Sequence, residues 1–157
     1  MSTHHATVAW ALPGGVDFAK GRYSRLHTLE FEGGIVVPGS ASPSVVPAPW
    51  SSAEAVDPEA AFTAALSACH MLTFLDLARR AGFTITAYRD DAEGTLSRVS
   101  RGKMAVTRVV LRPDIAWSGE KTPTAEELAA LHHDAHDLCF IANSVTTEVV
   151  VEEPLAG

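Results

Sequence analysis

The chain contains two cysteines, Cys69 and Cys139, and each has a histidine close by. His70 directly follows the first cysteine, and His136 stands three residues before the second. A cysteine thiolate is a nucleophile and a metal ligand, whereas a buried thiol behaves as a small apolar side chain. In a reducing compartment these three uses are more common than a structural disulfide. The residue types therefore indicate redox or metal chemistry as alternatives to simple core packing.

Three of the potential ligands would share one helix face. His132, His136 and Cys139 follow i, i+4, i+7 spacing, which places them on the same side of a helix. Imidazole nitrogens and thiolates are typical zinc ligands. The set offers only three ligands, and histidines beside an apolar stripe are more often core or interface residues. A zinc site therefore remains an alternative.

A carboxylate, Glu59, lies ten residues before Cys69 in the same predicted helix. This separation corresponds to about 15 Å of helical rise. Glu59 could therefore meet Cys69 only if the chain or a partner subunit folds around the helix. Alternatively, Glu59 is a first-turn carboxylate that is stabilised by the helix macrodipole. The spacing leaves both uses open.

The first cysteine is predicted to lie in a long apolar helix. Asp57 is a suitable N-cap, Pro58 suits the first helical position, and Gly82 suits the C′ position after a helix that ends near Ala81. The middle of this segment is apolar nearly all round. That pattern is typical of a helix buried in the fold or in a dimer core.

The second cysteine is predicted to lie inside another helix. Thr124 and Glu127 have the spacing of a capping box, in which each side chain bonds the backbone N–H of the other residue. Leucine and alanine residues then form an apolar stripe. The helix is expected to end near Asn143, which would place Cys139 in its interior.

The remaining segments are predicted to be strands and loops. A loop rich in proline, serine and alanine covers residues 38–52. The expected strands are residues 7–12, 23–32, 35–37, 83–88, 106–111 with an extension over 115–117, and 145–151. Strands and helices do not alternate in a βαβ rhythm, so the order predicts an α+β fold. One domain is expected for residues 1–157.

The bulk composition argues against several classes of function. The 157 residues carry a formal net charge of −7 at pH 7, so neither nucleic acid nor an anionic membrane is the expected partner. The most apolar stretch, residues 60–75, is interrupted by polar side chains and is short for a membrane span. Residues 1–12 do not resemble a signal peptide, which favours the cytoplasm. Nucleotide-binding and hydrolase motifs are absent, so no cofactor is expected.

The segments around both cysteines resemble the OsmC/Ohr family, the osmotically inducible and organic hydroperoxide resistance proteins. The first match is Asp57-Pro58-Glu59 followed by Leu66-Ser67-Ala68-Cys69-His70. The second is Leu131-His132-x-x-Ala135-His136-x-x-Cys139-Phe140-Ile141-Ala142-Asn143-Ser144-Val145. Residues 23–27 and 88–94 fit as well, so the resemblance covers nearly the whole chain. Asp57 is a departure, because asparagine is common there in the family.

The resemblance implies both a fold and an activity. The fold would be OsmC-like: antiparallel sheets with two central helices, intertwined in a homodimer whose active sites lie at the subunit interface. The activity would be thiol-dependent reduction of organic hydroperoxides. A small dithiol or a lipoylated protein would be the reductant, and neither a metal nor another cofactor is implied.

The resemblance also assigns roles to individual residues. Cys69 would attack the peroxide O–O bond and become a sulfenic acid, and Cys139 would resolve it to a disulfide before over-oxidation occurs. A free thiol is mostly protonated at neutral pH, so a cation beside the sulfur is needed. Arg25 is the expected cation and Arg22 the second choice. Glu59 would hold that arginine through a charged hydrogen bond.

An apolar pocket beside the cysteines would suit an organic peroxide. Its expected substrate-binding residues are His70, Phe74 and Phe140, with Arg22, and Phe62 and Met71 are further lining candidates. Two alternatives remain open. One is a non-catalytic, stress-related dimer of the same fold with a poorly activated thiol, and the other is a metal-binding dimer that uses the histidines.

Overall fold

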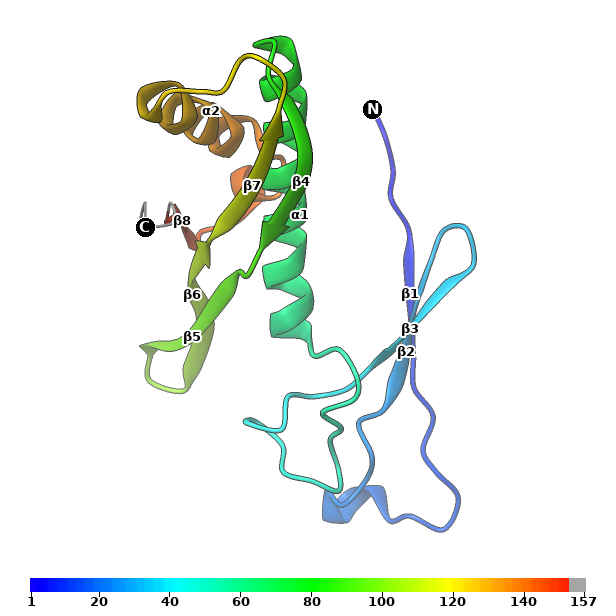
Figure 1. The fold of residues 1–157 in the computed structure, drawn as a ribbon. Helices are drawn as coiled ribbons and strands as arrows, with labels where there is room; N and C mark the ends of the chain where they lie inside the picture. Colours follow the sequence, from blue (N-terminus) through cyan, green and yellow to red (C-terminus); the bar gives the residue numbers. More distant parts are fainter. Residues whose placement is uncertain (153–157) are drawn as a thin grey trace. The chain divides into compact units, whose positions relative to one another are not determined.

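A computed structural model describes residues 1–152 of the chain. The chain forms two compact units, Met1–Ala61 and Phe62–Gly157. Figure 1 labels their elements, which are β1 (Ala6–Ala9), η1 (Phe18–Lys20), β2 (His27–Phe31), β3 (Ile35–Gly39), α1 (Pro58–Arg80), β4 (Thr84–Asp90), β5 (Glu93–Ser100), β6 (Lys103–Leu111), β7 (Pro113–Ser118), α2 (Ala125–Leu138), η2 (Ala142–Ser144) and β8 (Glu148–Val151). The predicted α+β class is confirmed.

The first unit is built on a three-stranded antiparallel sheet. Strand β2 lies in the centre and pairs with β1 on one side and β3 on the other. The turn between β2 and β3 uses Gly33 and Gly34 at φ values of 83° and 78°. Glycine adopts this left-handed region without a Cβ clash, and two such residues suit a tight hairpin turn. This turn lies between the strands predicted at residues 23–32 and 35–37.

In the second unit, α1 contributes to two hydrophobic clusters. Near its C-terminal end, Phe74 and Ala78 pack with residues of α2, β4 and β7. Farther towards its N-terminus, Leu66 packs with residues of β6 and β8. Figure 1 shows α1 running behind β4 and β7, with α2 beside its C-terminal part. The apolar pattern of the helix is therefore divided between two sets of strands.

The strands of this unit form two sheets. Strand β4 pairs with β7, and β6 lies between β5 and β8, with β5 antiparallel and β8 parallel to it. The extension of the 106–111 strand over 115–117 is wrong, because β6 ends at Leu111 and β7 begins at Pro113. Proline has no N–H to donate and ends the first ladder. The second strand then pairs with β4 instead.

Strand β5 is missing from the sequence prediction. Its residues, Glu93–Ser100, are mostly polar and exposed, so they lack the β-branched and alternating pattern that identifies a strand. Pairing with β6 along nearly its whole length forms the strand. The tertiary partner, and not local propensity, decides this element.

The helix predicted around Cys69 is confirmed, with α1 spanning 23 residues. Its complete length exceeds the apolar stretch at residues 60–75. By length and composition alone, α1 could cross a membrane. This evidence is weak, because the core helix of a soluble protein meets the same two criteria.

Helix α1 comes close to β5 at Gly94. A Cβ added there would overlap Thr63 Oγ1 and lie 3.5 Å from Val106 Cγ1. Thr63 is buried, and its branched side chain has little rotamer freedom in a helix. We therefore expect Gly94→Ala to lower the free energy of unfolding by about 1–3 kcal/mol, as overpacking does. Urea denaturation followed by circular dichroism measures the change.

Gly14 provides the matched control for this substitution. It has no atom within 4 Å of an added Cβ, so Gly14→Ala should change the unfolding free energy by less than about 0.5 kcal/mol. Equal stabilities for Gly94→Ala and the unmodified protein would show that the helix can move away from β5 without cost.

Candidate functional site

The structure brings the two cysteine thiols together. Cys69 lies in the middle of α1 and is partly buried, whereas Cys139 follows the last residue of α2 and is 1% exposed. The two side chains hydrogen-bond each other, and both are free thiols. Burial raises the pKa of Cys139, and the hydrogen bond that its thiol donates to Cys69 raises the pKa further. The site is thus a pair of adjacent thiols, one accessible and one enclosed.

The prediction that Cys139 lies inside a helix is wrong. Helix α2 ends at Leu138, and Cys139 is its C-cap with ψ at 114°. The Asn143 amide donates to Asp137 O at 2.7 Å, which satisfies one of the carbonyls that a helix end leaves unpaired. The backbone N–H of Ala142 donates to Cys139 Sγ at 3.4 Å. This hydrogen bond holds the Cys139 sulfur beside a backbone N–H and partly offsets the rise in the pKa of its thiol.

Two buried imidazoles join the helices that lead to the two cysteines. His70 Nε2 and His132 Nδ1 are 3.0 Å apart, and their rings stack at 11°. His70 is 1% exposed and His132 5% exposed. Burial lowers the pKa of each to about 4. His70 is also close to Asp90, which opposes the shift, and to His136, which adds to it.

This pairing bears directly on the zinc hypothesis. His132 directs Nδ1 at another imidazole, so it does not join His136 and Cys139 around a common point. Among residues 1–152, no group of three or more His, Cys, Asp or Glu side chains is placed to hold a metal ion. The ligand set proposed from i, i+4, i+7 spacing therefore gains no support from the fold.

A second polar contact, missed at the sequence level, ties α1 to the strands. Ser67 Oγ donates to Asp90 Oδ2 at 2.5 Å, and Arg112 N donates to Asp90 Oδ1 at 2.6 Å. Ser67 and His70 are three residues apart and share a helix face. Two polar residues on one face of an apolar helix are the signal that could have indicated a buried polar partner.

The two phenylalanines expected at the pocket lie in opposite environments. Phe74 is 0% exposed and stacks on His132 with 4.4 Å between ring centroids. Phe140 is 82% exposed and directly follows Cys139. Phe74 therefore packs within the core cluster, whereas Phe140 presents its ring to the outside beside the thiol pair. Their predicted contact with substrate remains a prediction.

The predicted arginines belong to the first unit. Arg25 donates from one guanidinium nitrogen to Gly21 O at 3.0 Å and to Tyr23 O at 2.5 Å, and its guanidinium lies 3.9 Å from the Tyr23 ring centroid. Arg22 is exposed, and Glu59 lies in the first turn of α1. Their predicted relation to Cys69 remains a prediction.

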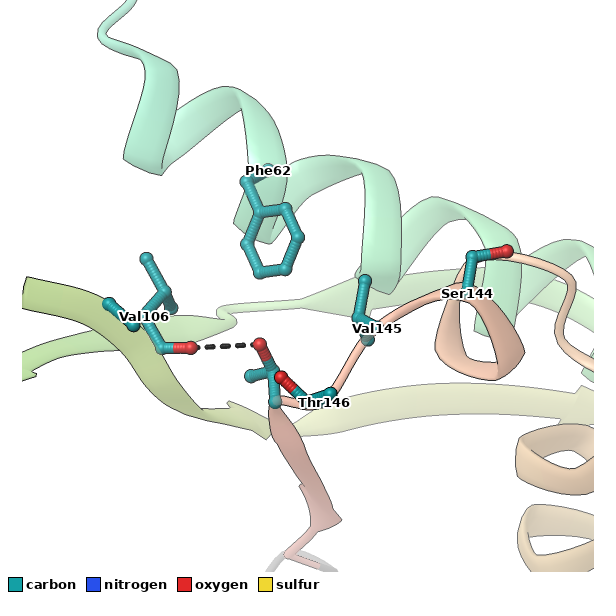
Figure 2. A pocket seen from close by; sticks show the side chains of 7 residues that line it. Phe62, Val106, Ser144, Val145 and Thr146 are labelled. Carbon is teal, nitrogen blue, oxygen red and sulfur yellow. Dashed lines mark hydrogen bonds between the residues drawn. The ribbon is translucent and has the colours of Figure 1, made fainter. Parts of the chain in front are cut away.

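An open cavity of about 430 Å³ lies along α1 on its N-terminal side. Figure 2 shows Phe62 pointing from α1 towards Val106 and Val145, beside a hydrogen bond that joins Val106 O to the segment after Val145. The lining residues are Phe62, Ala105, Val106, Ser144, Val145, Thr146 and Thr147. Phe62 lines this cavity, but neither cysteine does. The predicted place of Phe62 in a substrate pocket beside the cysteines therefore remains a prediction.

Acidification should weaken the fold through the buried imidazoles. An unfolded histidine titrates near pH 6.5, whereas His70 in the fold has a pKa of about 4. The unfolded chain therefore binds more protons between these pH values, and stability present above pH 6.5 is lost as the pH falls. For His70 the loss should be about 2 kcal/mol at pH 5.

Urea midpoints at pH 7 and pH 5 measure this loss. His132 contributes in the same direction, since burial also lowers its pKa. A His132→Leu variant should therefore lose less stability on acidification than the unmodified protein. An equal loss in both would show that carboxylates, and not the imidazole pair, cause the pH dependence.

Comparison with known proteins places the chain in a family. Residues 51–153 match the family model described as OsmC-like protein. The chain is 51% identical to an OsmC-like protein of unknown function from Vibrio cholerae, with a TM-score of 0.95 and coverage of 98% of this chain and 100% of that one. No match was found among curated proteins.

Two more distant structures share the fold. An organic hydroperoxide resistance protein OsmC from Legionella pneumophila is 20% identical, with a TM-score of 0.66 and coverage of 98% of this chain and 96% of that chain. The organic hydroperoxide resistance protein OhrB of Bacillus subtilis is 18% identical, with a TM-score of 0.68 and coverage of 98% of each chain. At these identities the likeness shows the fold alone. The family model and the Vibrio relative show that the chain belongs to the OsmC-like family.

Proposed function

We propose that the chain is a thiol-dependent peroxidase that reduces organic hydroperoxides. The observation that carries this proposal is the hydrogen bond between the Cys69 and Cys139 thiols. Two thiols in contact can form and break a disulfide without a large change in the fold. Membership of the OsmC-like family supports the same function, because structures that share the fold are named organic hydroperoxide resistance proteins.

The reaction has two steps at the thiol pair. The Cys69 thiolate attacks the terminal peroxide oxygen, the O–O bond breaks, and the alkoxide leaves as the alcohol after it takes a proton. Cys69 is now a sulfenic acid. The Cys139 sulfur displaces water from it, and a 69–139 disulfide forms. Two electrons have passed from the thiols to the peroxide.

Different burial of the two thiols supports this order of attack. Cys69 is partly exposed and can meet a peroxide, whereas Cys139 is enclosed and touches Cys69. Burial also raises the pKa of Cys139, which keeps it protonated and unreactive towards peroxide in the resting state. Cys139 therefore reacts best with the oxidised Cys69 beside it.

The proposal includes the charged groups that activate Cys69. An arginine from residues 1–61, Arg25 or Arg22, stabilises the thiolate and holds a peroxide oxygen, and Glu59 orients that guanidinium. A small dithiol or a lipoylated protein then reduces the disulfide. Such a dithiol returns both cysteines to thiols and becomes a cyclic disulfide itself.

The active form in this proposal is a homodimer. Large apolar side chains on α1 and at the end of α2 are exposed, at 63% for Leu72, 54% for Leu138 and 82% for Phe140. Exposed apolar side chains that gather in one patch are typical of an interface. Sedimentation of the full chain should give twice the monomer mass, and a monomer at micromolar concentration would contradict the dimer.

Mass spectrometry after one equivalent of cumene hydroperoxide tests the activity. The expected product is the intact chain with two hydrogens lost and a 69–139 cross-linked peptide. Hydrogen peroxide, which has no apolar part, serves as the comparison substrate. A protein that leaves cumene hydroperoxide unconsumed and keeps two free thiols would instead be the non-catalytic member of the fold.

A further inference from the structure

The hydrogen bond between His70 and His132 joins α1 to α2. His70 directly follows Cys69 on α1, and His132 lies seven residues before Cys139 on α2. Seven residues are about two helical turns. The bond therefore connects the same two segments that carry the cysteines.

The two rings determine each other's orientation. His70 Nδ1 is buried and has no hydrogen-bond partner in the part of the chain that is described, so Nε2 is the ring nitrogen that anchors it. On the other side, Phe74 stacks on His132 at 24°. One imidazole must donate and the other accept, which makes the contact directional.

A directional bond fixes how far α2 lies along α1. Moving α2 by one helical turn, about 5.4 Å, would break the 3.0 Å contact and leave both imidazoles buried without it. Leaving a buried polar group unpaired is costly. Apolar side chains of similar volume could fill the same space, but they would tolerate such a shift, which is why buried polar pairs can specify register.

We propose that His70 and His132 are positioning residues whose hydrogen bond holds Cys139 in contact with Cys69. The inference rests on the proposed function, because it assigns the pair to the disulfide-forming step. The imidazoles do not touch the peroxide in this role. They act by setting the distance between the two sulfurs.

The equilibrium between the protein and glutathione tests this role without any peroxide. Two protein thiols and one glutathione disulfide give the 69–139 disulfide and two glutathione molecules. At known concentrations of reduced and oxidised glutathione, the equilibrium ratio of disulfide to dithiol protein measures the effective concentration of one cysteine thiol at the other. We expect His132→Leu to lower this effective concentration by about tenfold, which corresponds to the loss of one net hydrogen bond.

Further variants separate positioning from general packing. His132→Asn replaces Nδ1 with an amide near the same place and should restore most of the effective concentration. His70→Leu should lower it as much as His132→Leu, and the double variant should be no worse than either, because both remove the same bond. His133→Leu alters an exposed neighbour that pairs with Asp137, and it should have no effect.

Three results with the variants would overturn the inference. They are an effective concentration within twofold of the unmodified protein in His132→Leu, an equal loss in His133→Leu, or additive losses in the double variant. Circular dichroism at the same pH verifies that each variant is folded. If His132→Leu does not fold, His132→Asn and His70→Leu still decide the question.

The glutathione measurement also distinguishes this inference from the proposed function. A 69–139 disulfide that forms with glutathione but not with cumene hydroperoxide would end the peroxidase proposal and leave the positioning role measurable. If the unmodified protein does not form the disulfide with glutathione, the positioning role is overturned. The two sulfurs would then not be in contact, and the imidazoles would have no contact to maintain.

Discussion

Replacing Cys69 with serine is expected to abolish turnover of organic hydroperoxides. Serine has nearly the same shape, but its hydroxyl does not ionise at neutral pH and is a weak nucleophile towards peroxide oxygen. Cys69 is the accessible member of the thiol pair. Consumption of cumene hydroperoxide with excess dithiol should therefore fall to the rate of the dithiol alone.

The fold of Cys69→Ser should remain intact. Cys69 is partly buried and belongs to neither hydrophobic core cluster. The circular dichroism spectrum of the variant should therefore match that of the unmodified protein. Residual turnover at a tenth of the normal rate or more would indicate that Cys139 is the nucleophile. In that case the order of attack inferred from burial would be wrong.

Replacing Cys139 with serine is expected to permit a single turnover followed by inactivation. Cys69 can still reduce one equivalent of hydroperoxide, but its sulfenic acid has no neighbouring thiol to form a disulfide. A second peroxide then oxidises it to the sulfinic acid, which a dithiol does not reduce. Mass spectrometry should show two added oxygen atoms on the peptide that contains Cys69.

The time course distinguishes resolution from a structural role. Cys139→Ser should consume the first equivalent at close to the normal rate, consume a second as the sulfinic acid forms, and then stop, whereas a misfolded variant would lose the first turnover too. Steady cycling of Cys139→Ser with a small dithiol would show that the reductant attacks the sulfenic acid directly. Cys139 would then not be the resolving thiol.

Local sequence signals were sufficient to predict the helices that begin with clear capping residues and have a clear apolar pattern. The capping box predicted at Thr124 and Glu127 is present, and α1 begins at Pro58, as its N-terminal signals indicate. The end of α2 was wrong by several residues, because the Asn143 side chain and the Cys139 turn stop the helix through contacts that helical periodicity does not report. The polar strand β5 was missed, since its pairing with β6 defines it.

The sequence by itself determined where the two helices begin, their N-terminal caps and the residue types that could do redox chemistry. Only the tertiary structure decided which of those residues meet: the Cys69 and Cys139 thiols, the His70 and His132 imidazoles, and Ser67 with Asp90. Each contact joins segments distant in the chain, so it depends on how α1, α2 and β4 pack. Helix periodicity predicts which face of a helix a residue occupies. Which element packs against that face depends on how the whole unit buries its apolar surface.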